Sequence, residues 1–214
     1  MDGLLLDSEP VYRMSWQRTA ADLGIPLSDA FYLTLVGISN QDAEAILEQT
    51  YGARFSARRF RQRWTRYWDE HVREHGLPLK PGVTELLAFL EKRRTPTAVA
   101  TSTAHAEALH ALRDLAGRFD CIVTGDMVAR GKPAPDIFLM AAQRLRLPPE
   151  RCLALEDSEA GVIAAHAAGM TVIMVPDLKQ PSPDVAAQAQ CVCASLDAVR
   201  ELLGARVSPA ARQA

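Results

Sequence analysis

The chain has 214 residues, of which 48% are hydrophobic and 23% charged, and its net charge is −2 at pH 7. This length and composition are typical of one large globular domain or of a domain with an insertion, and the near-neutral charge predicts no general attraction to nucleic acid or to an anionic membrane. No apolar run reaches the roughly 20 residues of a spanning helix, and no basic-then-apolar signal segment opens the chain.

The segment from residue 10 to residue 78 is predicted to be helical. Apolar residues recur at helical spacing near 10–23, 40–50 and 56–75, without a strand pattern between them. The apolar face of the last stretch consists of Phe60, Trp64, Tyr67 or Trp68, and His71. The arginines between 54 and 66 fall on the other side, which favours a solvated basic face over a nucleic-acid site.

Strand and helix patterns alternate in the rest of the chain. Buried strands are predicted at 97–100, 121–123, 152–155 and 171–175, with an edge strand at 191–193. Helices are predicted near 83–93, 105–116, 135–146, 159–168 and 196–203. This alternation predicts an α/β domain with a Rossmann-like parallel sheet flanked by helices, formed by residues 1–9 and 79–214, into which the helical domain 10–78 is inserted.

Cysteine and histidine pairs have simple structural interpretations. The chain's cysteines, which we interpret as reduced core residues of a cytoplasmic protein, are Cys121, Cys152, Cys191 and Cys193. Cys191 and Cys193 could bind a metal, but their spacing is that of one strand face, which we favour. His71 and His75 lie one helical turn apart, as in a zinc pair, but no Glu or Cys completes a motif.

Polar side chains cluster where the predicted strands end. The stretches that carry them are 2–7, 101–103, 125–136 and 156–158. Because the carboxyl ends of parallel strands share one edge of a sheet, we expect these side chains to meet. Carboxylates suit Mg²⁺, while an ammonium group and hydroxyls suit phosphoryl oxygens. The sequence therefore predicts a site for a magnesium-bound phosphate group.

Each of these side chains taken alone has another explanation. Thr101 or Ser102 could cap the next helix, Asp157 or Ser158 could do the same, and Lys132 could be a solvated loop residue. Their combination at successive strand ends favours the functional interpretation. No glycine-rich nucleotide fingerprint occurs, so a nucleotide held by backbone amides is not expected.

Four segments resemble, in the right order, the motifs of the haloacid dehalogenase-like (HAD) superfamily and its β-phosphoglucomutase-like phosphatases. They are Asp-Gly-Leu-Leu-Leu-Asp-Ser-Glu (2–9), Ala-Thr-Ser-Thr (100–103), Gly-Lys-Pro-Ala-Pro-Asp-Ile-Phe (131–138) and Leu-Glu-Asp-Ser-Glu-Ala-Gly (155–161). The resemblance covers nearly the whole chain, and it implies a HAD core in which residues 10–78 form a helical cap domain.

The resemblance implies a role for each matching residue. Asp2 would be the general acid and base, and Thr101, Ser102 and Lys132 would bind the phosphoryl group. The residues implied for holding Mg²⁺ are Asp2, through its backbone carbonyl, Glu156 and Asp157.

The family's first motif, Asp-x-Asp-Gly, begins with the aspartate that attacks phosphorus. Matching Asp2 to its second aspartate makes Met1 the "x", so the nucleophile would precede Met1 and the first core strand would be missing too. Losing a central strand would cost many kcal/mol against a total stability of about 5–15 kcal/mol. We therefore expect the functional chain to start upstream, with an aspartate codon directly before the Met1 codon. A catalytically inactive truncated homologue is the alternative.

Hydrolysis is favoured over a mutase reaction by two departures from the family's mutases. Asn40 stands where their cap loop has an arginine, and Tyr12 stands where they have a histidine. The cap-loop residues expected to contact the leaving group of the substrate are Gly37, Ser39, Asn40 and Gln41. A dehalogenase is not expected, because that branch works without metal and lacks the aspartate matched by Asp2.

The predicted function is Mg²⁺-dependent hydrolysis of small phosphomonoesters, such as sugar phosphates, through a phospho-aspartate intermediate. A β-phosphoglucomutase-type phosphosugar mutase is the second alternative. A cap over a small site excludes macromolecules, so we expect a small phosphorylated metabolite as the partner, with no nucleic acid and no membrane. The sequence specifies neither the ester nor the oligomeric state, and a monomer is compatible with it.

Overall fold

The structure, a computed structural model, describes residues 1–36 and 40–207. It divides into two compact units: Met1–Leu6 with Leu79–Ala214, called here the core unit, and Asp7–Pro78, called here the helical unit. None of the helices in the described residues combines the length and the apolar character needed to span a bilayer.

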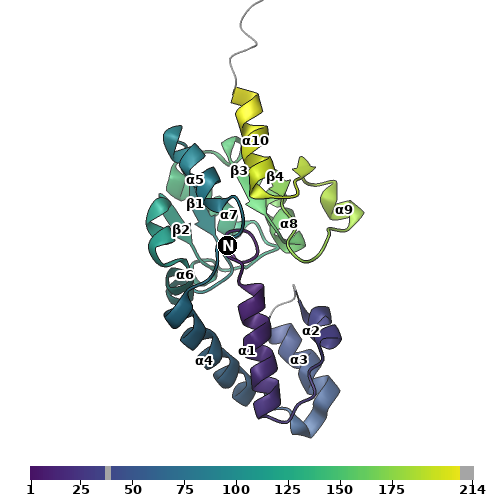
Figure 1. Cartoon of the computed structure of the whole chain (residues 1–214). Coiled ribbons are helices and arrows are strands. Elements are labelled where there is room, and N and C mark those ends of the chain that lie inside the picture. The colour runs from purple at the N-terminus through teal and green to yellow at the C-terminus, as the bar shows by residue number, and fades with distance from the viewer. Residues whose placement is uncertain (37–39, 208–214) are drawn as a thin grey trace, which may run out of the picture. The chain divides into compact units, whose positions relative to one another are not determined.

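The helical unit contains α1 (Glu9–Asp22), α2 (Asp29–Leu35), α3 (Asn40–Tyr51), a 3₁₀ turn (Gly52–Arg54) and α4 (Ala57–His75) (Figure 1). The helix α2 was not predicted, because seven residues are too few for a helical period to emerge. Its start nevertheless carries a local signal, since the Ser28 hydroxyl caps the helix by accepting a hydrogen bond from the Phe31 amide.

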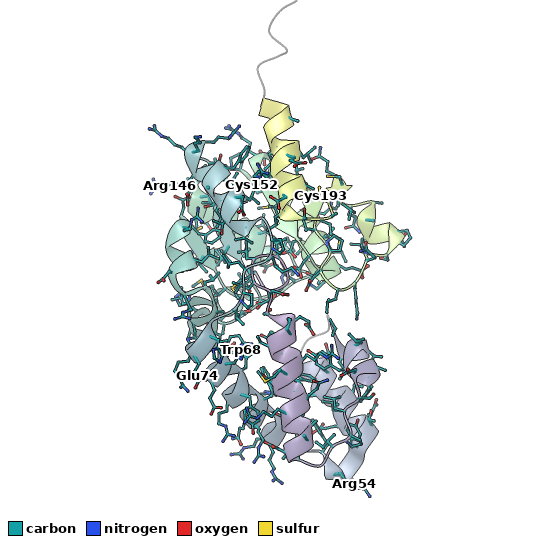
Figure 2. All side chains as sticks on the ribbon, viewed as in Figure 1. Arg54, Trp68, Glu74, Arg146, Cys152 and Cys193 are labelled. Carbon is teal, nitrogen blue, oxygen red and sulfur yellow. The ribbon has the colours of Figure 1, made fainter. Side chains whose placement is uncertain are left out.

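Aromatic side chains fill the centre of the helical unit. The buried residues of α4 are Phe60, Trp64, Tyr67, Trp68 and Val72, and Figure 2 shows Trp68 on this helix. The ring of Trp16 from α1 packs edge-on against Phe60, with centroids 5.2 Å apart. The basic side of α4 pairs with neighbouring helices, where Arg61 binds Glu44 and Arg63 binds Asp22.

Short parallel strands form the sheets of the core unit. Strand β1 (Ala98–Ala100) pairs with β2 (Cys121–Val123), and a second sheet has the order β3 (Leu153–Glu156), β4 (Thr171–Met174) and β5 (Cys191–Val192). The helices are α5 (Val83–Lys92), α6 (His105–Leu112), α7 (Asp136–Leu145), α8 (Glu159–Ala167), α9 (Pro183–Ala186) and α10 (Leu196–Val207). These parallel strands and the helices between them confirm the α/β class predicted from the sequence.

Helices cover both faces of the second sheet. Successive residues of β4 point to opposite sides, so Val172 and Met174 pack with α7 and α8, while Ile173 packs with α5 and α10. Figure 1 shows α10 lying beside α5. Leu4 from the opening turn joins the α5–α10 side of this core, which anchors the turn in the core unit.

The element boundaries differ from the predictions in a few places. The helix predicted over 105–116 ends at Leu112, because Arg113 takes a left-handed φ of 49° and the chain continues as a 3₁₀ turn. Strand β3 lies one residue later than predicted, and β5 is one residue shorter. The short helix α9 was not predicted.

The cysteines and the histidine pair carry no metal-binding cluster. All four cysteines are free, and the sulfur atoms of Cys191 and Cys193 lie 3.9 Å apart; Figure 2 labels Cys152 and Cys193 in the core unit. The rings of His71 and His75 lie 4.9 Å apart. Within the described residues, no three His, Cys, Asp or Glu side chains are grouped so that they could hold a metal ion.

Candidate active site

The opening turn of the core unit presents Asp2. The Gly3 amide donates to the Leu6 carbonyl at 2.9 Å, and the Leu5 amide donates to the Met1 carbonyl at 2.8 Å. Leu6 is almost fully buried and forms an isolated bridge with Leu79. These contacts fix the backbone of residues 1–6 in the core unit.

Asp157 lies against this turn at Gly3. The φ of Gly3 is +71°, and a Cβ placed there would lie 2.3 Å from Asp157 Oδ2. Any other residue would therefore meet both backbone strain and a clash with the carboxylate. The glycine lets a carboxylate that follows β3 approach the backbone beside Asp2.

A hydroxyl from the loop after β1 holds the Asp2 side chain. The Thr103 hydroxyl donates to Asp2 Oδ2 at 3.2 Å, and the Thr103 amide donates to the Thr101 hydroxyl at 3.2 Å. Thr101 is buried, whereas Ser102 is exposed. Thr101 does not cap the next helix, because its hydroxyl accepts the Thr103 amide within its own loop.

Lys132 is held by acceptors from two strand ends. Its ammonium group donates to the Ala100 carbonyl at 3.2 Å and forms an ion pair with Glu156 Oε1. The side chains of Lys132 and Glu156 are only 10% and 5% exposed. Lys132 is therefore not a solvated loop lysine, and its charge is buried directly beside the segment that carries Thr101.

The second oxygen of Glu156 is bound at the start of α8. The Ser158 hydroxyl donates to Glu156 Oε2 at 3.1 Å and accepts from the Gly161 amide at 3.2 Å, so it also caps the helix. A Cβ at Gly161 would lie 1.9 Å from Glu156 Oε2. Gly161 thus leaves room for the carboxylate at the positive end of the helix.

Burial is the main influence on the Asp157 carboxyl group. The pKa of Asp157 is raised from 3.8 to about 6 as the net result of several effects: burial and the charge of Glu156 raise it, while the α-amino group of Met1 and Lys132 lower it. The negative form of Asp157 is therefore unfavourable in the folded protein near neutral pH unless a cation compensates it.

Replacing Asp157 with asparagine is expected to stabilise the metal-free protein. Since the folded-state pKa is raised from 3.8 to about 6, ionised Asp157 destabilises the fold above pH 6 and not below pH 4. Two pKa units correspond to at most about 3 kcal/mol in the free energy of unfolding. Thermal unfolding in EDTA should give a higher Tm for Asp157→Asn at pH 8, and no difference from the original chain at pH 4.

The matched control for this variant is Asp114→Asn, which changes an exposed carboxylate of the same unit. Its Tm should equal that of the original chain at both pH values. A gain for Asp157→Asn of the same size at pH 4 and at pH 8 would contradict the assignment to buried charge.

The donor set at the turn fits a hard cation. Asp157 and Glu156 provide carboxylate oxygens at the end of β3, and Gly3 brings the Asp2 backbone to Asp157. Mg²⁺ typically takes one or two carboxylates, with water and substrate phosphate as the remaining ligands.

The structure brings most of the predicted site residues together in the core unit. Thr103 binds both Asp2 and Thr101, Lys132 binds Ala100 and Glu156, and Asp157 lies against Gly3. Gly37 and Ser39 lie outside the described residues, as do the side chains of Asn40 and Gln41. Tyr12 belongs to the helical unit, where its ring lies 5.8 Å from those of Trp64 and Trp68.

Sequence reasoning missed two hydroxyl partners and misread one carboxylate. Thr103 binds Asp2, and Ser158 binds Glu156. In the sequence, only their positions inside the motifs indicated these contacts. Asp126, counted among the polar strand-end groups, instead accepts the His105 amide with both oxygens and so caps α6. It also accepts from the Thr124 hydroxyl, so its role is structural.

Comparison with known proteins identifies the family of this chain. Residues 1–169 match the model of a family described as haloacid dehalogenase-like hydrolase. The chain belongs to the haloacid dehalogenase-like hydrolase family. This membership confirms the family predicted from the four sequence motifs.

Relatives of this haloacid dehalogenase-like hydrolase include named phosphatases. It is 37% identical over 176 residues to the phosphorylated carbohydrates phosphatase of Thermotoga maritima, covering 79% of each chain. It is 32% identical to the fructose-1-phosphate phosphatase of Escherichia coli, covering 82% of this chain and 93% of the relative. The solved structure of CbbY from Rhodobacter sphaeroides in complex with phosphate superposes with a TM-score of 0.76, at 29% identity over 92% of each chain.

Proposed function

We propose that this protein hydrolyses the phosphomonoester of a small phosphorylated sugar. The observation that carries the proposal is that Thr103 connects the Asp2 carboxylate to the buried Thr101, while the buried Lys132 ammonium binds the carbonyl of Ala100, the residue before Thr101. Relatives named as sugar-phosphate phosphatases support the substrate class.

Asp2 acts as the general acid and base in this proposal. Its carboxyl group gives a proton to the leaving alcohol and later takes one from the attacking water. The hydroxyl of Thr103 fixes the orientation of this carboxyl group through Oδ2.

Thr101 and Lys132 bind the phosphoryl oxygens. A buried ammonium group interacts more strongly with developing negative charge than a solvated one, because water screens it less. Glu156 and the Ala100 carbonyl hold the ammonium in place before the substrate arrives, so little reorganisation is needed. Ser102 stays a further candidate for contact with the phosphate.

The proposed metal ligands are Asp157, Glu156 and the Asp2 carbonyl. When bound there, Mg²⁺ would neutralise charge on the phosphate group and orient it. The helical unit is proposed to act as the cap, and Gly37 to Gln41 as its substrate-contacting loop.

The test measures phosphate release from a panel of sugar phosphates and from p-nitrophenyl phosphate. Two proteins would be assayed with Mg²⁺ and with EDTA: the chain as printed, and a longer one in which an aspartate directly precedes Met1. Hydrolysis that requires Mg²⁺ is expected. Interconversion of sugar phosphates without net phosphate release would instead indicate a mutase, and no turnover by either protein would favour the inactive homologue.

Replacing Thr103 with valine is expected to lower kcat about tenfold and leave KM nearly unchanged. Losing a hydrogen bond to a charged group costs roughly 1.5 kcal/mol, and here it frees the orientation of Asp2. Thr103→Ser keeps the hydroxyl and is expected to retain most of the activity. Equal kcat values for the valine variant and the original protein would show that Thr103 does not orient Asp2.

A further inference from the structure

An ion pair beside the opening turn has no role in the chemistry described above. Lys80 Nζ donates to Asp177 Oδ1 at 2.7 Å. The two side chains are 25% and 16% exposed, so both charges are largely withdrawn from water. Burying two charges costs desolvation energy, which only a close, well-oriented pair can offset. A pair buried beside the opening turn therefore deserves a structural explanation.

Lys80 is attached to the opening turn through its backbone. Its amide donates to the Leu5 carbonyl at 2.9 Å, and the preceding residue, Leu79, bridges Leu6. A shift of the turn would therefore shift Lys80 with it.

Asp177 also lies against the opening turn. It follows β4, and its Oδ2 lies 3.2 Å from the position that a Cβ on Gly3 would take. Asp157 Oδ2 lies 2.3 Å from that position. Both carboxylates therefore lie close to Gly3. Lys80 connects the turn to Asp177, since its amide binds Leu5 and its ammonium group binds Asp177, which itself lies next to Gly3.

We infer that Lys80 and Asp177 are positioning residues that clamp the Asp2–Gly3 turn against Asp157 and so set the cation site. The inference rests on the proposed function for the cation itself. Its physical basis is that a cation held by Asp157 and the Asp2 carbonyl binds well only when these two oxygens keep a fixed separation. The Lys80–Asp177 pair ties the opening turn to the segment after β4, and β4 pairs in the sheet with β3, the strand that Asp157 follows.

The cation affinity of a Lys80→Met variant distinguishes positioning by Lys80 from a simple electrostatic effect of its charge. Removing a positive charge near a cation site should tighten cation binding by electrostatics alone. Loss of the clamp should weaken it instead, since partners outside the ligand shell typically contribute 10- to 100-fold in metal affinity. The two accounts predict changes of opposite sign.

The experiment titrates the chain as printed with Mn²⁺, following free Mn²⁺ by electron paramagnetic resonance below the unfolding temperature of every variant. Lys80→Met and Asp177→Asn are each expected to weaken Mn²⁺ binding about tenfold or more, and Lys80→Arg is expected to recover most of the affinity. The control, Arg118→Met, removes the cation of a core-unit ion pair with the same 2.7 Å separation, formed with Glu91. It should leave the affinity unchanged.

Unfolding temperatures in EDTA separate positioning from stability. A lower Tm for Lys80→Met with unchanged or tighter Mn²⁺ binding would overturn the inference and leave the pair a purely structural one. Failure of the original chain to bind Mn²⁺ would overturn the metal part of the proposed function, and the inference with it. Weaker binding by Arg118→Met, equal to that of Lys80→Met, would also overturn it.

Discussion

Asp2→Asn is expected to lower kcat about a thousandfold in whichever form of the protein hydrolyses phosphate esters. Asparagine keeps the size of the side chain and can still accept the Thr103 hydrogen bond, but it cannot transfer a proton. General acid–base catalysis typically contributes about 100- to 10,000-fold, and the loss should fall on kcat rather than on KM. Steady-state kinetics with a sugar phosphate at saturating Mg²⁺ measure this.

A control variant and a second substrate show whether the loss of kcat comes from proton transfer by Asp2. Asp114→Asn, which changes an exposed carboxylate in the same unit, should keep full activity. A substrate whose leaving group needs no proton, such as p-nitrophenyl phosphate, should be affected less than a sugar phosphate. An Asp2→Asn variant with normal kcat on sugar phosphates would exclude the assigned role.

Lys132→Met is expected to reduce both activity and stability. Removing an ammonium group that binds the transferring phosphoryl oxygens typically lowers kcat about 100-fold. The same change leaves the Glu156 carboxylate buried without its cation, which costs about 3 kcal/mol in the free energy of unfolding. Kinetics and urea denaturation of the metal-free protein measure the two effects separately.

A double variant distinguishes the two consequences. Adding Glu156→Gln to Lys132→Met removes the uncompensated charge and should restore most of the lost stability, while the activity stays low because Glu156 is itself a proposed metal ligand. Lys92→Met, at an exposed position, is the control and should change neither quantity. If the double variant recovered activity together with stability, Lys132 would have only a structural role.

The order of elements in the core unit could be predicted because each strand and helix there has its own local pattern. Short apolar runs marked β1 to β4, and helical periods marked α5, α7 and α8. The helices α2 and α9 were missed because they are shorter than the window in which a period can be recognised. The early end of α6 depends on a positive φ at Arg113, which apolar spacing does not encode.

The candidate site was predicted from strand ends and motif order, but its internal contacts were not. Thr101, Lys132, Glu156 and Asp157 could be named because they lie at or after strand ends and match the family's motifs. The residues that these side chains contact could not be predicted from the sequence, because most of them lie far away along the chain: Thr103, for example, binds Asp2, 101 positions away. Asp126 was misplaced among the candidates because strand-end position does not distinguish a catalytic carboxylate from a helix cap.

The sequence by itself determined the family, the α/β class and the residue types available at the site, because these depend on local periodicity and on motifs of adjacent residues. Only the tertiary structure decided which of those residues meet. The approach of Asp157 to Gly3 and the pairing of Lys80 with Asp177 join segments more than 90 residues apart. Such contacts are set by how helices pack on both faces of β4, and that packing is a property of the whole core.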